Sequence, residues 1–89
     1  MNYSFDPAKQ ALNVKRHGLF FTEAQEFEWE SALIVLDDRR NYGETRFTAT
    51  GLIGNRVCVM VFHLRETSVR LISLRKANRR EVMRYANQI

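Results

Sequence analysis

The sequence predicts an α+β fold in which two N-terminal helices precede a four-stranded antiparallel sheet and a C-terminal helix. Three observations support this prediction. Apolar residues recur at helical spacing in the first third of the chain, whereas after Ser31 they alternate or form short continuous runs, as in strands. The links between these runs are short, which permits only antiparallel neighbours. Capping residues precede the first and last helical segments.

The first helix is expected over residues 7–17. Asp6 suits the N-cap because its carboxylate accepts free backbone N–H groups, and Pro7 has the φ that the first helical position requires. Gly18 predicts the end of the helix. The residues predicted to face inward are Ala8, Ala11, Leu12 and Lys15.

Two further helices are expected. Thr22 with Glu23 resembles an N-cap, and the short helix after it is predicted to bury Ala24, Phe27 and Trp29. Asn78 stands three residues before Glu81, at the spacing of a capping box, and predicts the start of the C-terminal helix. The predicted inward face of that helix carries Val82, Tyr85, Ala86 and Ile89.

Four strands are predicted over residues 32–37, 45–53, 56–64 and 68–75. The connections Gly54-Asn55 and Arg65-Glu66-Thr67 are too short for a parallel crossover. The strands are therefore expected to form a meander.

Length and charge limit the class of protein. A chain of 89 residues suits one compact domain, 1–89, and a hydrophobic content of 45% is enough for a core. Fourteen Lys and Arg against ten Asp and Glu leave a net charge of +4, and seven of the basic residues lie between positions 65 and 84. Such a region attracts phosphates, although a solvated basic surface explains it equally well.

The single cysteine and the hydropathy pattern bear on location. Cys58 lies in an apolar run and is interpreted as a small buried hydrophobe, which fits a reducing compartment. No stretch approaches the roughly 20 apolar residues of a membrane span, and the start of the chain lacks the pattern of a signal peptide. We therefore expect a cytoplasmic protein without membrane contact.

Two ordered sets of residues stand out. The first is Phe5-Asp6-Pro7, Lys9, Asn13, Arg16-His17-Gly18, Phe21 and Ala24. The second is Gly43-Glu44-Thr45-Arg46, Gly51, Arg70, Ile72-Ser73-Leu74-Arg75, Ala77, Glu81 and Tyr85. Together they span nearly the whole chain and resemble the bacterial BrnT family of toxins.

The resemblance implies the toxin of a type II toxin–antitoxin system with a RelE-like ribonuclease fold. Such a toxin is a metal-independent endoribonuclease that cleaves RNA and inhibits translation and growth. The resemblance also implies a BrnA-like antitoxin that neutralises the toxin in a heteromeric complex, with operator DNA contacted only through the antitoxin. No cofactor and no metal are implied, and two histidines with one cysteine cannot form a zinc finger.

Arg46 and Arg75 are the predicted phosphate-stabilising residues. Metal-free RNA cleavage must deprotonate a 2′-hydroxyl, stabilise the charge on the phosphorane and protonate the leaving oxygen. A guanidinium stays charged and can hold two phosphate oxygens at once. Arg46 shares a strand face with Thr48 and Thr50, which is typical of a phosphate cradle or of an ordinary solvent-facing surface, and the resemblance favours a function for both arginines.

Candidates for proton transfer are His17 and Glu44. His17 precedes Gly18 at a helix end, where it either stabilises the helix dipole or carries a proton or contacts RNA. Glu44 either acts as a base, if an apolar neighbour raises its pKa, or pairs with Arg46. For His63 the pattern favours a partly buried histidine with satisfied hydrogen bonds, and a catalytic role is the alternative.

Further residues are candidates for RNA binding. Arg70 points away from the face of Arg75 unless a bulge intervenes. Lys76, Arg79 and Arg80 either solvate the start of the last helix or grip the RNA backbone. Tyr85 is a candidate base-stacking residue, with core packing as its alternative. A non-catalytic module that uses the same basic surface to bind nucleic acid or a protein partner is the alternative to the nuclease.

Overall fold

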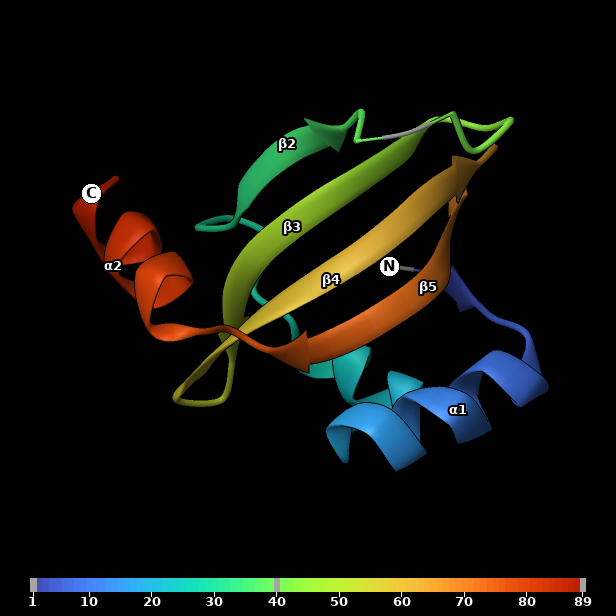
Figure 1. Ribbon diagram of the computed structural model, residues 1–89, viewed down its shortest axis with the longest axis horizontal. Coiled ribbons are helices and arrows are strands. Elements are labelled where there is room, and N and C mark those ends of the chain that lie inside the picture. Colours follow the sequence, from blue (N-terminus) through green and yellow to red (C-terminus); the bar gives the residue numbers. More distant parts are fainter. Residues whose placement is uncertain (1, 40, 89) are drawn as a thin grey trace.

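A computed structural model describes residues 2–39 and 41–88, and its centre is a five-stranded sheet (Figure 1). The strands follow the order β1-β5-β4-β3-β2 across the sheet. Their bounds are β1 Asn2–Ser4, β2 Leu33–Asp37, β3 Arg46–Ile53, β4 Arg56–Arg65 and β5 Ser68–Lys76. Strands β2 to β5 are consecutive antiparallel neighbours, whereas β1 pairs in parallel with β5.

The predicted fold class is wrong in two respects. The sheet is five-stranded and mixed, not four-stranded and antiparallel, because β1 adds a parallel edge. One α-helix stands at each end of the chain, α1 Pro7–His17 and α2 Arg79–Asn87, and the expected second N-terminal helix is absent from the described residues. The arrangement expected from a RelE-like fold, with two N-terminal helices and a four-stranded antiparallel sheet, is therefore not the one observed.

Strand β1 has only three residues, which is too short to show an alternating pattern. It pairs with Ser68–Arg70 at the far end of the chain, so the argument from short connections does not apply to it. Parallel pairing is possible here because residues 5–67 separate the two strands, far more than a parallel crossover needs.

A 3-10 helix, η1 Phe21–Glu26, occupies the place of the predicted second α-helix. Its N-cap is Phe20, not Thr22, and the Phe20 N–H donates to the Glu23 carboxylate over 2.8 Å. A 3-10 helix has three residues per turn, which aligns positions three apart. That spacing explains the choice of helix type, because Phe21, Ala24 and Phe27 are all buried.

Helix α1 has the predicted ends but not the predicted inner face. Asp6 caps it by accepting from the Ala8 N–H at 2.9 Å, and Gly18 ends it with a φ of 72°. The predicted stripe of Ala8, Ala11, Leu12 and Lys15 is wrong, because all four residues are exposed and Asn13 is the buried residue.

The burial of Asn13 follows from the position of α1 beside the edge of the sheet. The Asn13 side-chain amide donates to the Leu74 carbonyl at 2.8 Å and to the Leu19 carbonyl at 2.9 Å, and its oxygen accepts from the Leu74 N–H at 3.0 Å. Strand β1 reaches only as far as Arg70, so Asn13 takes the place of a strand partner further along β5.

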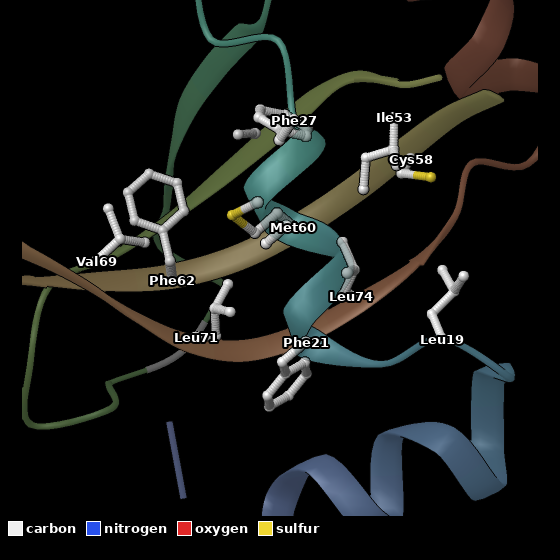
Figure 2. Close-up of a cluster of buried hydrophobic side chains, with 12 residues drawn as sticks. Leu19, Phe21, Phe27, Ile53, Cys58, Met60, Phe62, Val69, Leu71 and Leu74 are labelled. Atoms are coloured by element: carbon white, nitrogen blue, oxygen red, sulfur yellow. The ribbon is translucent and has the colours of Figure 1, made fainter. Parts of the chain in front are cut away.

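The core lies between η1 and one face of the sheet, where side chains of β3, β4 and β5 meet Phe21, Ala24 and Phe27 (Figure 2). Cys58 is fully buried in this cluster, as predicted, and burial raises the pKa of its thiol. Gly51 is required here, since a Cβ atom would lie 2.7 Å from the Phe27 ring.

Helix α2 is held at one end of the sheet, next to β3 (Figure 1). The predicted capping box is present, with Asn78 and Glu81 each accepting from the other's backbone N–H at 2.8 Å. Tyr85 is buried, which agrees with core packing, one of its two predicted roles, and its hydroxyl donates to Ser31 Oγ at 3.0 Å. Ile89, predicted on the same face, lies outside the described residues. Neither described helix is long and apolar enough to cross a membrane.

Replacing Asn13 with Ala tests the role of its amide. The change leaves backbone groups of Leu19 and Leu74 without their partner, so we expect the free energy of unfolding to fall by about 3 kcal/mol. Urea unfolding measures this change. Asn87→Ala, at an exposed position of α2, is the matched control and should shift stability by less than about 0.5 kcal/mol. Equal effects of the two changes would contradict the assignment.

Candidate functional site

The face of the sheet opposite η1 carries three rows of side chains, because residues paired across neighbouring strands point to the same side. One row has Leu33, Thr50, Val59 and Arg75, and the next has Val35, Thr48, Val61 and Ser73. The last row has Asp37 paired with Arg46, and His63 paired with Arg70. Arg46 and His63 are neighbours in this row, since Phe47 pairs with Phe62.

A β-bulge in β5 joins Arg70 to this face. The register shifts between Val61 and Phe62, which pair with Ser73 and Leu71, so Ile72 is the extra residue. Leu71 and Leu74 both point into the core as a result, and Arg70, Ser73 and Arg75 share the opposite face. The bulge that the sequence left open is therefore present, and it puts Arg70 and Arg75 on the same face of the sheet.

This face forms the floor of a cavity of about 730 Å³. Residues of helix α1 and of the segment that follows β2 also line it, together with Glu81 of α2. The cationic side chains among the described lining residues are Lys9, Arg16, Arg39, Arg46 and Arg75, and the carboxylates are Asp37, Asp38 and Glu81. Between the charges the floor is apolar or hydroxylated, with Thr48, Val59, Val61 and Ser73.

Arg46 enters the cavity with most of its donors available. Its Nε donates to the Glu44 carboxylate at 3.1 Å, and its guanidinium carbon lies 4.0 Å from the centre of the Tyr42 ring. No described residue accepts a hydrogen bond from its two terminal nitrogens. The hydrogen bond from Arg46 lowers the pKa of Glu44, which makes Glu44 a weaker base. Of the two alternatives for Glu44, the ion pair with Arg46 is the one present.

Arg75 uses more of its hydrogen-bond donors within the protein than Arg46 does. Both of its terminal nitrogens donate to Glu81, at 2.7 and 2.8 Å, and one also contacts the Lys76 carbonyl. The bidentate hydrogen bond from Arg75 lowers the pKa of Glu81 to about 2, and the same pairing raises the pKa of Arg75. Arg75 therefore fastens α2 to β5, and its Nε remains for a ligand.

The segment after β2 is shaped by a third arginine–carboxylate pair. The Asp37 carboxylate is buried and accepts from Arg39 Nε at 2.8 Å and Nη2 at 2.9 Å, with the Tyr42 hydroxyl at 3.3 Å. The hydrogen bonds from Arg39 lower the pKa of Asp37 to about 2. This pair belongs to the same wall of the cavity as Tyr42, and the Arg46 guanidinium stacks on the Tyr42 ring.

Several lining residues were missed by the sequence analysis. Lys9 and Arg16 lie seven residues apart on α1, which puts them on the same side of the helix and is the signal that could have revealed them. In the described part of the chain, neither they nor Arg70 has an acidic partner within ion-pair distance. Asp37 ends β2, and Arg39 and Tyr42 lie in the irregular segment after it, whose course the sequence pattern does not predict.

Of the other residues predicted to belong to the site, one lines the cavity and the rest do not. His17 lines the cavity at the end of α1, where it also lies in the last turn of that helix. Lys76, Arg79 and Arg80 are exposed but do not line the cavity. Tyr85 is only 6% exposed and faces the protein, so its ring is not available for stacking on a base. Across the described residues, no group of three or more His, Cys, Asp or Glu is placed to hold a metal ion.

A sheet face lined by guanidinium and ammonium groups, several of which have no acidic partner among the described residues, has the charge that suits a polyanionic ligand. The family model of BrnT, the ribonuclease toxin of a type II toxin–antitoxin system, matches residues 5–81, and the chain belongs to this family. It is thus a ribonuclease toxin that has an antitoxin as its partner. No curated protein matches the chain. The matched range contains every residue that lines the cavity and ends at Glu81.

The pH dependence of stability tests the Arg75–Glu81 pair. A carboxylate whose pKa is lowered on folding stabilises the protein fully above its ordinary value of 4.5, and this contribution is lost as the pH falls through about 2. Because Arg75 is partly exposed, we expect wild type to lose about 2 kcal/mol more than Glu81→Gln between about pH 5 and about pH 2. Gln retains the capping geometry, so the comparison isolates the charge. Parallel curves in urea unfolding would contradict the pair's contribution.

Proposed function

We propose that the chain is a metal-independent endoribonuclease that cuts RNA in the cavity on the open face of the sheet. The observation that supports this most directly is the hydrogen bonding of Arg46. Its Nε donates to Glu44, whereas its two terminal nitrogens donate to no described residue. A guanidinium held in this way can hold two phosphate oxygens and stabilise the charge that develops on the phosphorane, a task that a metal ion performs in other nucleases.

We assign different parts of the RNA backbone to the two predicted arginines. Arg46 is level with His63, and Arg75 is level with Val59, four residues before His63 in β4. Their backbones are therefore separated by about 13 Å along the strand direction. Arg46 binds the scissile phosphate, and Arg75 binds a flanking phosphate and holds α2 in place. His17 carries a proton or contacts RNA at the α1 wall, and Glu44 orients Arg46.

The cations without acidic partners extend this contact. Lys9 and Arg16 on α1, together with Arg70 on β5, border the same face, and bases fit over the apolar floor between them. Lys76, Arg79 and Arg80 are proposed to contact RNA outside the cavity. We leave Tyr85 out of the proposed RNA contacts because it is buried.

The partner of the chain is proposed to be a BrnA-like antitoxin that forms a heteromeric complex and covers the basic cavity. Contact with operator DNA occurs only through this antitoxin. The toxin acts in the cytoplasm, where cleavage of RNA inhibits translation and growth. Membership of a type II toxin–antitoxin family supports an antitoxin as partner.

Incubation of the antitoxin-free protein with a defined RNA in EDTA tests the reaction. We expect new RNA ends, with a 2′,3′-cyclic phosphate on one side of each cut and a 5′-hydroxyl on the other, because the attacking group is the neighbouring 2′-hydroxyl. End mapping measures both products. Salt-dependent binding with intact RNA would favour the non-catalytic nucleic-acid-binding module instead.

Replacing Arg46 with Ala is expected to slow cleavage by about 10²–10³-fold, the usual effect of removing one donor to a developing oxyanion. The matched control is Arg56→Ala, which removes the same charge from a residue that pairs with Glu23 and does not line the cavity. Single-turnover cleavage measures both, and unfolding by urea confirms that the variants fold. Equal rates for the two variants would remove Arg46 from the site.

A further inference from the structure

His63 occupies a position between two arginines on the open face of the sheet. It pairs with Arg70 on β5, and the register of β3 places Arg46 next to it on the other side. Side chains of opposed residues on adjacent strands are about 5 Å apart at Cβ. The three residues therefore form one row, Arg46–His63–Arg70, across three strands.

The hydrogen bond of the ring fixes which nitrogen is basic. His63 Nδ1 lies 3.0 Å from the Thr45 carbonyl oxygen, which has no proton to donate. Nδ1 must therefore carry the proton, and in the neutral ring the lone pair is on Nε2. Throughout the described chain no residue is hydrogen-bonded to Nε2. A half-buried imidazole with a fixed tautomer and an unused basic nitrogen is the arrangement that general-base catalysis requires.

The charged groups around His63 come from three elements and one loop. Arg46 faces it from β3, Arg70 from β5 and Arg65 from its own strand, while Glu44 is close enough for its charge to interact with the ring. Arg46 has free terminal nitrogens and Arg70 has no acidic partner within the described chain. A phosphodiester held by these two guanidiniums would lie over Nε2.

We propose that His63 is the general base of the RNA cleavage reaction, acting through Nε2 on a phosphodiester bound by Arg46 and Arg70. The proposal rests on the proposed function and assigns the base to neither His17 nor Glu44. Nε2 takes the proton of the 2′-hydroxyl as its oxygen forms a bond to phosphorus. The bond from phosphorus to the 5′-oxygen breaks, its electron pair leaves with that oxygen, and water protonates it. The imidazolium then returns its proton to solvent.

The experiment compares wild type with His63→Gln and His63→Ala in single-turnover cleavage across a range of pH. Loss of a general base slows proton transfer by about 10²–10⁴-fold, so we expect a decrease of this size in both variants. Wild type should lose activity on the acid side as an imidazole becomes protonated, and this limb should be missing from the residual activity of His63→Gln. Added imidazole should restore part of the activity of His63→Ala, which a merely structural role would not allow.

Two further measurements separate chemistry from binding and folding. The affinity for an RNA with a 2′-deoxy group at the cleavage position should be the same in wild type and His63→Gln, and so should the Tm. If wild type cleaves RNA and His63→Gln cleaves it equally fast, or keeps the acid limb, the proposal is overturned while the nuclease function stands. If wild type itself leaves RNA intact, both fail.

Discussion

The open face of this sheet depends on one extra residue in β5. In a regular strand Arg70 and Arg75, five positions apart, would point to opposite sides. The bulge at Ile72 reverses the alternation between them, so that Leu71 and Leu74 both complete the core while Arg70, Ser73 and Arg75 share the opposite face. The same irregularity therefore serves packing on one side and gathers positive charge on the other.

Local features of the fold could be predicted from the sequence, and features set by distant contacts could not. Strands β2 to β5 follow from apolar patterns and short links, and the ends of α1 and α2 follow from their capping residues. Strand β1 and the buried face of α1 both depend on β5, which Asn13 contacts across 61 positions of the chain. A stripe of apolar residues suggested the wrong inner face for α1, because the helix meets backbone groups at a sheet edge.

The same distinction between local features and distant contacts applies to the candidate site. Residue type and family resemblance selected Arg46, Arg75 and His17 as candidate catalytic residues, and all three line the cavity. The pair of Glu44 with Arg46 was one of two alternatives predicted from the sequence. The pairs Arg75–Glu81 and Arg39–Asp37 were not predicted, because they depend on how α2 and the segment after β2 are placed. The position of the carboxylate decides which donors remain available to a ligand. Glu44 accepts from Nε and leaves the terminal nitrogens of Arg46 available, whereas Glu81 accepts from both terminal nitrogens of Arg75. The strand register similarly changes the interpretation of His63, which the sequence pattern alone assigned to an ordinary structural role.

Because Cys58 is buried, its reaction with an alkylating reagent measures local opening of the core. Its sulfur lies in the core between β4 and η1, and burial disfavours the thiolate that alkylating reagents attack. Labelling must therefore wait until η1 and the sheet separate. With a single thiol in the chain, the rate of alkylation reports on that opening, from the side of the sheet opposite the charged face.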